Sequence, residues 1–295
     1  MSNENIVEFK NVSKWYGEGK DRTYVLKNIN LTIKEGEFLA IVGFTGSGKT
    51  TLINLLSGLL EPSEGEVLFK GEPVKGPSLE RGIIFQNYSL LPWFNVYQNV
   101  QLGVDAVYPD WDKDKKEAHI RKFINMVNLT PATEKYPKEL SGGMRQRVAV
   151  ARVLASDPEL LLMDEPLGAL DALTRGNLQD EILNIWGANQ RTALLITNDV
   201  DEGILMADRI IPLNPGPNAT LGPEYTINVN RPRDKTSLNT DENFKKVRTA
   251  VLNYLIELGD ASRLTQTNDY TLPDLQPKSL LKTSNSFSNP FKKAS

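Results

Sequence analysis

Short apolar segments in the first ninety residues predict a series of β-strands. Residues 25–33 alternate apolar and polar side chains, as in a strand with one buried face. Residues 38–42 are continuously apolar and are followed by a glycine, which is typical of a buried strand in a parallel sheet. Further apolar runs predict strands at residues 6–9, 65–69 and 82–85.

Helical patterns follow and interrupt this series of strands. Residues 50–60 carry leucines at helical spacing along one face. Residues 87–157 are mostly helical in pattern, with prolines as breaks, and apolar strand patterns return at residues 160–163 and 193–196. A helical insert at about residues 87–157 within an α/β sheet domain is the simplest arrangement that accounts for this order.

The composition changes towards the C-terminal end. The chain is rich in Pro, Gly and Asn from residue 212 and becomes polar after residue 233. Apolar residues at helical spacing predict one amphipathic helix near residues 241–258. The following stretch is rich in Ser, Thr, Asn and Lys and is expected to be flexible. We therefore divide the chain into a main domain (1–230), an extension with one helix (231–259) and a polar tail (260–295).

The composition excludes several kinds of site. The chain has no cysteine, which rules out thiolate nucleophiles and cysteine-bound metal clusters. Its single histidine, His119, follows a charged run and is expected to be a solvated surface residue. The net charge of −3 supplies no basic field for nucleic acid, so no nucleic-acid partner is expected. The N-terminus lacks a signal-peptide pattern, and no apolar run approaches the ~18 residues of a membrane span.

Residues 43–50 read GFTGSGKT and match the phosphate-binding loop motif G-x-x-x-x-G-K-[ST]. The motif lies between a predicted buried strand and a predicted amphipathic helix, as this type of site requires. Glycines let successive N–H groups point at phosphates, the lysine adds a positive charge, and the threonine hydroxyl can ligate Mg²⁺. The alternative is a chance match, and GEGK at residues 17–20 is interpreted as a turn. The predicted nucleotide-binding residues are Gly43, Phe44, Thr45, Gly46, Ser47, Gly48, Lys49, Thr50 and Thr51.

Two acidic residues follow the apolar strand pattern LLLM at residues 160–163. Beside a phosphate-binding loop, Asp164 is predicted to hold Mg²⁺ directly or through water. Glu165 is predicted to polarise the water that attacks the γ-phosphate. The alternative is a pair of acids at the exposed end of a strand.

The sequence LSGGMRQR at residues 140–147 identifies a resemblance to the ATP-binding cassette (ABC) ATPases. On its own, Ser141 followed by two glycines is also a plausible start of a helix. The order of the motifs nevertheless matches the family from residue 6 to about residue 230. This order is Tyr16, the phosphate-binding loop, Gln86, LSGGMRQR, the strand ending in Asp164 and Glu165, and then Asp171.

The resemblance implies a fold and roles for individual residues. The expected fold is an α/β P-loop nucleotide-hydrolase core with a mostly parallel sheet, an N-terminal antiparallel β part and an inserted helical subdomain. Tyr16 is expected to stack on adenine, although Trp15 is a competing candidate and either ring could be part of the core. Gln86 is expected to contact Mg²⁺ and the attacking water and to link the site to a membrane partner. Residues expected to act on the nucleotide of a second subunit are Leu140, Ser141, Gly142, Gly143 and Asp171.

The same resemblance implies partners and a location. Two such subunits are expected to enclose two ATP molecules, each with Mg²⁺, and to drive an integral membrane permease from its cytoplasmic face. Sequences such as FQNYSLLPWFNVYQNV and TNDVDEGILMADRIIPLNPGP resemble the nitrate, sulfonate and taurine importers, and most of all the nitrate/nitrite, cyanate and bicarbonate group. A solute-binding protein would then act indirectly. The alternatives are a soluble ABC ATPase of translation or DNA repair, and a regulatory subunit that binds nucleotide without hydrolysing it.

One position departs from the family pattern. Asn198 stands where these ATPases usually have a histidine that contacts the γ-phosphate. An asparagine is shorter and cannot carry a charge near neutral pH, so its hydrogen bond to phosphate is weaker. We therefore expect a slow site and favour a heterodimer with a related ATPase that keeps its histidine, with a homodimer as the alternative.

Residues 87–96, after Gln86, contain several large apolar side chains in a predicted loop. Such a cluster indicates a surface for docking the permease. The alternative is that these side chains pack inside the helical insert.

Overall fold

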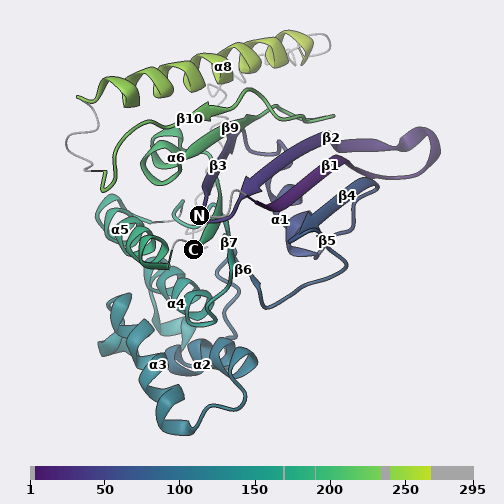
Figure 1. The fold of residues 1–295 in the computed structure, drawn as a ribbon. Coiled ribbons are helices and arrows are strands. Elements are labelled where there is room, and N and C mark those ends of the chain that lie inside the picture. Colours follow the sequence, from purple (N-terminus) through teal and green to yellow (C-terminus); the bar gives the residue numbers. More distant parts are fainter. Residues whose placement is uncertain (1–3, 169, 190, 234–239, 267–295) are drawn as a thin grey trace, which may run out of the picture.

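A six-stranded, mostly parallel sheet forms the centre of the protein (Figure 1). The computed structural model describes residues 4–168, 170–189, 191–233 and 240–266. All neighbouring strands of this sheet run parallel except the pair at one edge, β10 and β9. The strand order is β10 (Tyr225–Thr226), β9 (Arg209–Leu213), β3 (Phe38–Gly43), β8 (Thr192–Thr197), β7 (Leu160–Asp164), β6 (Arg81–Ile84).

A second, antiparallel sheet covers helix α1 (Lys49–Ser57) from the opposite side. One apolar core joins α1 to both sheets, because Leu52 and Ile53 pack in the same cluster as Val7 of one sheet and Ile41 of the other. This arrangement confirms the predicted N-terminal antiparallel part. Its strand order is β2 (Thr23–Lys34), β1 (Asn5–Tyr16), β4 (Glu64–Phe69), β5 (Glu72–Pro73).

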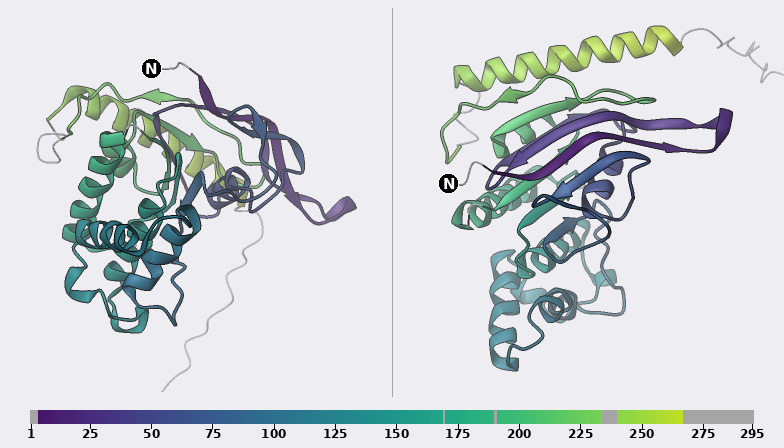
Figure 2. Two further views of the ribbon diagram at one scale, coloured as in Figure 1. Left: turned by 60° about the horizontal axis from the view of Figure 1, so that its bottom comes forward. Right: turned by 45° about the vertical axis from the view of Figure 1, so that its right-hand side comes forward.

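The predicted helical insert is confirmed between β6 and β7. It contains α2 (Val96–Val107), α3 (Lys113–Met126) and α4 (Gly142–Ala155), with short 3-10 turns at Thr130–Ala132 and Pro137–Glu139 where the prolines fall. The remaining helices are α5 (Ala172–Asn189), α6 (Val200–Met206) and α8 (Glu242–Gln266). The insert and α8 lie at opposite ends of the molecule (Figures 1 and 2). None of the helices in the described part of the chain is long and apolar enough to cross a membrane.

Three local expectations have a definite outcome. The sequence GEGK gives a 3-10 turn at Gly19–Asp21. The helix expected at 241–258 is α8, which continues to Gln266, while the rest of the polar tail lies outside the described residues. The expectation for His119 is wrong. Its ring is half-buried against aromatic rings, including Trp111 and Phe123, and its Nε2 lies 3.0 Å from the carbonyl oxygen of Ala155.

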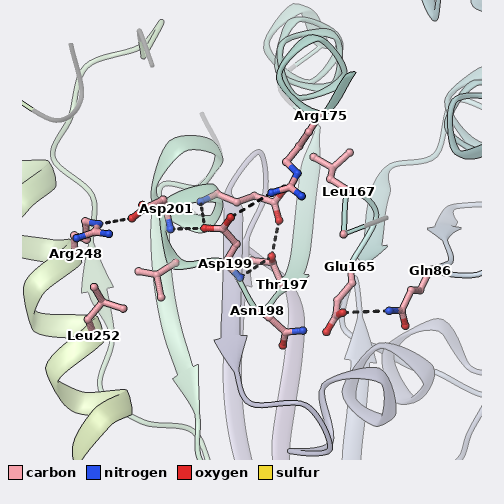
Figure 3. A pocket seen from close by; sticks show the side chains of 13 residues that line it. Gln86, Glu165, Leu167, Arg175, Thr197, Asn198, Asp199, Asp201, Arg248 and Leu252 are labelled. Atoms are coloured by element: carbon pink, nitrogen blue, oxygen red, sulfur yellow. Dashed lines mark hydrogen bonds and ion pairs between the residues drawn. The ribbon is translucent and has the colours of Figure 1, made fainter. Parts of the chain in front are cut away.

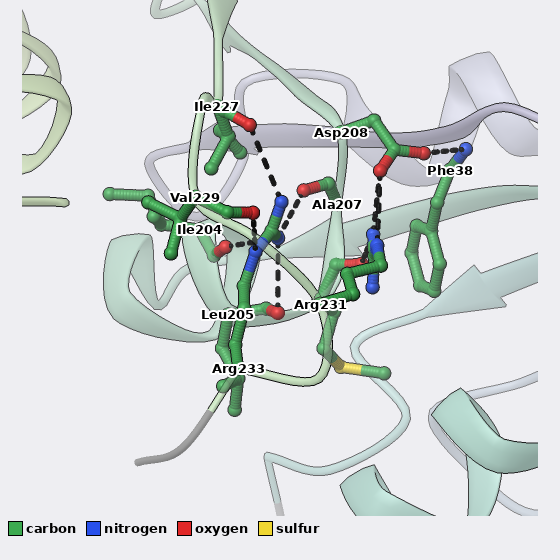
Figure 4. Close-up of polar contacts among 10 residues, drawn as sticks. Phe38, Ile204, Leu205, Ala207, Asp208, Ile227, Val229, Arg231 and Arg233 are labelled. Atoms are coloured by element: carbon green, nitrogen blue, oxygen red, sulfur yellow. Dashed lines mark hydrogen bonds and ion pairs between the residues drawn. The ribbon is translucent and has the colours of Figure 1, made fainter. Parts of the chain in front are cut away.

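Two arginines, Arg231 and Arg233, attach the chain near residue 230 to the end of α6 (Figure 4). The guanidinium of Arg233 is buried and donates to the carbonyl oxygens of Ile204, Leu205 and Ala207 at that end. Arg231 pairs with Asp208 at 2.8 Å. Asp208 in turn accepts a hydrogen bond from the N–H of Phe38 at the start of β3. Burial lowers the pKa of Arg233 to about 10, still well above neutral pH, so a cation caps the last carbonyls of α6.

Replacement of Arg233 with methionine is expected to lower the free energy of unfolding by about 3 kcal/mol, because the variant leaves several buried carbonyl groups without a donor. Chemical denaturation of the full chain measures this change. Arg121→Met is the matched control, since Arg121 is exposed, pairs with Glu117 one turn away on α3 and lies 5.8 Å from the centre of the Tyr97 ring. A loss below about 1 kcal/mol for Arg233→Met would contradict the capping role.

Candidate functional site

The phosphate-binding loop leaves the end of β3, at the carboxyl edge of the parallel sheet. All six residues of β3 are buried, which fixes the start of the loop, and α1 begins at Lys49. Gly48 precedes α1 with a φ of 97°, and a Cβ there would lie 2.9 Å from Leu26 Cδ2. No side chain caps the first turn of α1. Its free N–H groups and the helix dipole therefore form an anion-binding end.

The ammonium group of Lys49 occupies the centre of the loop. It is almost fully buried and donates to the carbonyl oxygens of Gly43 at 3.0 Å and Phe44 at 2.9 Å. The carboxylate of Glu165 lies 3.4 Å away. Burial lowers the pKa of Lys49, while Glu165 acts in the opposite direction. A buried cation held mainly by neutral carbonyl oxygens is suited to receive the negative charge of a phosphate group.

Thr50 and Asp164 meet at the same edge of the sheet. The Thr50 hydroxyl donates to Asp164 Oδ2 at 2.9 Å, which joins the first turn of α1 to the end of β7. Burial raises the pKa of Asp164, which the Thr50 hydrogen bond and Lys49 partly offset. A hydroxyl and a carboxylate oxygen side by side are the donor types that Mg²⁺ prefers. The residues present therefore fit the predicted magnesium site.

Glu165 is held between the phosphate-binding loop and Gln86. Its backbone is in the left-handed region, with a φ of 45°, a strained conformation that often occurs at functional sites. Its N–H still donates to Ile196 of β8, so the turn begins directly after β7. Gln86 Nε2 donates to Glu165 Oε2 at 3.2 Å. This geometry brings the two predicted catalytic residues into contact.

Asn198 also contacts Lys49 and completes the cluster. Its Oδ1 accepts a hydrogen bond from Lys49 Nζ at 2.7 Å. Directly behind it, the buried carboxylate of Glu202 accepts hydrogen bonds from Thr197 Oγ1 and from Gln179 of α5. Burial raises the pKa of Glu202.

A cavity of about 550 Å³ opens beside this cluster (Figure 3). Gln86 and Glu165 form one side of it, and Asn198 lies between them and the start of α6. Arg248 and Leu252 of α8 form the far side. The cavity therefore extends from the predicted catalytic carboxylate to the C-terminal helix.

Other predicted residues lie outside this cluster. Among the described residues, no hydrogen bond or ion pair joins the LSGG segment or Asp171 to the phosphate-binding loop. Ser141 instead caps α4, and Asp171 caps α5 by accepting the N–H of Thr174. The two segments are neighbours, since a Cβ on Gly143 would lie 3.3 Å from Leu170 Cδ2.

The two candidate adenine-stacking rings differ in exposure. Trp15 packs against Tyr24, with their ring centroids 5.1 Å apart, and lies under the Arg22 guanidinium. Tyr16 is half-exposed, with the Lys14 ammonium 5.6 Å from the centre of its ring, and its greater exposure favours it for stacking on a base.

Sequence reasoning missed three residues that shape the cavity. Arg175 of α5 lies 3.7 Å from Asp199, whose side chain caps α6, and Arg248 of α8 binds Asp201. Asp199 precedes a helical pattern and could have been predicted as a helix cap. The two arginines have no such signal, because they reach the site only through tertiary contacts.

Comparisons with known proteins identify the family of the chain. Residues 26–168 match the model of the family described as ABC transporter. The chain is 45% identical over 250 residues to the bicarbonate transport ATP-binding protein CmpD of Synechococcus elongatus, which covers 85% of this chain and 89% of that protein. It is 40% identical over 253 residues to the nitrate import ATP-binding protein NrtD of the same organism, which covers 86% and 92%. The chain therefore belongs to the ABC transporter family.

A solved structure extends this assignment to the fold and the enzyme class. The dimeric ATP-binding cassette MJ0796, in a post-hydrolysis state bound to ADP and Pi, shares 31% identity with a TM-score of 0.70. The match covers 76% of this chain and all of that one. Within the family, the present chain is an ATP-hydrolysing subunit.

Proposed function

We propose that this chain hydrolyses ATP to energise an importer of a small anion, with nitrate or nitrite as the first candidate and bicarbonate or cyanate as close alternatives. The observation that carries the proposal is the convergence of Lys49, Glu165 and Asn198 at one edge of the sheet in a chain 40–45% identical to bicarbonate and nitrate transport ATPases. A sulfonate or taurine importer is the second candidate, because of the sequence resemblance described above.

The contacts support a separate role in hydrolysis for each residue of the site. Lys49 and the first turn of α1 hold the β- and γ-phosphates, and Thr50 and Asp164 hold Mg²⁺, which neutralises charge on the phosphate oxygens when bound. Glu165 accepts a proton from the attacking water, and Gln86 orients that carboxylate through its 3.2 Å hydrogen bond. Asn198 supplies a neutral amide near the γ-phosphate.

A second ATPase subunit is part of the proposal. The LSGG segment and Asp171 do not reach the phosphate-binding loop of their own chain, so they are free to complete the site of a partner. The Asn198 amide favours a partner that is a related ATPase with a histidine at this position. The complex is proposed to sit on the cytoplasmic face of the membrane, bound to an integral permease, with a solute-binding protein acting through that permease.

The substrate is tested by reconstituting the chain with its permease and its partner ATPase in vesicles. Uptake of labelled nitrate, bicarbonate, cyanate and taurine is then measured with and without MgATP. ATP-dependent uptake of nitrate or bicarbonate supports the proposal, and uptake of taurine alone would favour the second candidate. No ATP-dependent uptake of any of these anions would contradict both.

The permease is expected to dock on residues 87–96, and the structure supports this surface. Trp93 is 66% exposed, whereas Leu91 is half-buried. Serine at both positions is expected to weaken co-purification with the permease at least ten-fold, because a buried aromatic anchor contributes about 1.4 kcal/mol or more to an interface. Binding of MgATP to the isolated subunit should not change.

Ile256→Ser is the matched control for this prediction. Ile256 is 59% exposed on α8, at the end of the molecule opposite the insert. Its replacement should leave the complex intact. Unfolding of the isolated Leu91→Ser/Trp93→Ser subunit would show instead that these side chains pack inside the insert.

A further inference from the structure

We propose that Arg248 of α8 is a positioning residue of the ATPase site, which acts through Asp201 to hold Asn198 beside Lys49. The inference rests on the proposed role of Asn198 at the γ-phosphate. It assigns a part in hydrolysis to a helix that follows the six-stranded sheet and carries none of the sequence motifs of the site.

Helix α8 is firmly anchored on the core. It packs on α6 and along β9 and β10, at the edge of the six-stranded sheet (Figure 1). Phe244 and Val251 are buried in the main apolar core. Further along, the Tyr254 hydroxyl donates to Asn214 Oδ1 at 2.9 Å. With contacts on both sides of Arg248, the helix cannot slide along its axis without breaking one of them.

From this fixed helix, Arg248 reaches the loop that carries Asn198. Its Nε donates to Asp201 Oδ1 at 2.5 Å. Asp201 is the second residue of α6, and its own N–H binds Asp199 Oδ1 at 2.9 Å. Asn198 directly precedes this cap. A shift of the Asp201 end of α6 therefore moves Asn198 relative to Lys49.

The opposite end of α6 is also held from the C-terminal part of the chain. Arg233 binds the last carbonyl groups of α6, as described above. Two arginines from beyond residue 230 thus fix both ends of the short helix that follows Asn198. Figure 3 shows Arg248 across the cavity from Glu165, with Asp201 and Asn198 between them.

Helix α8 also approaches the phosphate-binding loop. A Cβ on Gly259 would lie 3.3 Å from Phe44 Cζ, so the helix backbone passes next to the aromatic residue of that loop. The same rigid helix therefore spans the loop that carries Lys49 and the loop that carries Asn198. The separation of these two loops therefore depends on the position of α8. Arg248 gives α8 a polar contact on the side of the Asn198 loop.

The test uses the full-length chain, whose own site carries Glu165 as the proposed base. Arg248→Met is expected to lower kcat for ATP hydrolysis about three-fold with KM for MgATP unchanged, since a half-exposed ion pair has an effect of this size. Combining Arg248→Asp with Asp201→Arg should restore most of the rate. Lys245→Met is the matched control, because Lys245 lies on the same helix and pairs with Glu242 of that helix.

Hydrogen exchange supplies a second measurement. In Arg248→Met, amide exchange at residues 198–202 should accelerate, while exchange in α1 should stay unchanged. Normal kcat in a folded Arg248→Met chain would overturn the inference, as would failure of the charge-swapped pair to recover. The proposed function fails separately, if Glu165→Gln leaves hydrolysis by the same full-length chain unchanged.

Discussion

Replacement of Lys49 with alanine is expected to weaken MgATP binding by about 100-fold. Lys49 supplies the side-chain cation of the phosphate-binding loop, and charge-assisted hydrogen bonds to phosphate contribute roughly 3 kcal/mol. The ammonium is already desolvated, because it is 5% exposed and its pKa is lowered by burial. Its attraction for a phosphate is therefore little screened by water.

Calorimetric titration of the full chain with MgATP measures this loss. The thermal shift that saturating MgATP gives to the wild-type protein should also disappear in Lys49→Ala. Lys70→Ala is a suitable control, since Lys70 is an exposed lysine paired with Glu159 and Glu80 away from the loop. Equal affinities of wild type and Lys49→Ala would remove the basis for the nucleotide site.

The second large effect on turnover is expected when the catalytic glutamate is replaced in the partner subunit rather than in this chain. In the assembled transporter, Glu165→Gln is expected to lower turnover no more than about two-fold, because a site that is already slow supplies less than half of the hydrolysis. The matching change in the partner ATPase should lower turnover roughly 100-fold, the usual contribution of a general base.

The reason for this asymmetry lies in Asn198. Its amide oxygen accepts a hydrogen bond from Lys49, so only its NH₂ remains to donate to phosphate. A neutral donor of this kind binds phosphate more weakly than a charged imidazole. The LSGG segment of this chain is intact and can complete the site built on the partner's loop.

Steady-state ATP hydrolysis by the reconstituted complex measures both variants under the same conditions. Asn198→His is a useful companion variant, because it should raise the contribution of this chain and make Glu165→Gln more damaging. If Glu165→Gln stops turnover as fully as the partner variant, or if the native complex contains only this ATPase, the asymmetry is wrong.

Residues in contiguous motifs could be predicted from the sequence, and their surroundings could not. The strands that end at Gly43 and Asp164 are short apolar runs, so their place in one parallel sheet follows from pattern alone, although β8 lies between them. The place of Gln86 at the site was expected only from the family resemblance, and its contact with Glu165 comes from the structure. His119 was misjudged, because the aromatic rings that bury it come from tertiary packing within the insert.

The contacts made by the C-terminal part of the chain show a further limit of prediction from the sequence. The pattern predicted a helix near residues 241–258 but gave no indication of what it covers. Arg248 and Arg233 read as ordinary polar residues of a charged segment, and only the fold shows that both bind α6. Their roles depend on partners 26–47 positions away, at distances that no local periodicity encodes.

The position of β3 at the centre of the sheet has a consequence for how the chain acquires its structure during synthesis. Ile41 pairs with Ile196 on one side and with Ile211 on the other, so both neighbours of β3 are made more than 150 residues later. Sheets built from such distant pairings fold slowly. A nascent chain that ends before β9 exposes at least one apolar edge of β3, which makes it a substrate for chaperones or aggregation. Nucleotide can therefore stabilise this protein only after more than two thirds of it has left the ribosome.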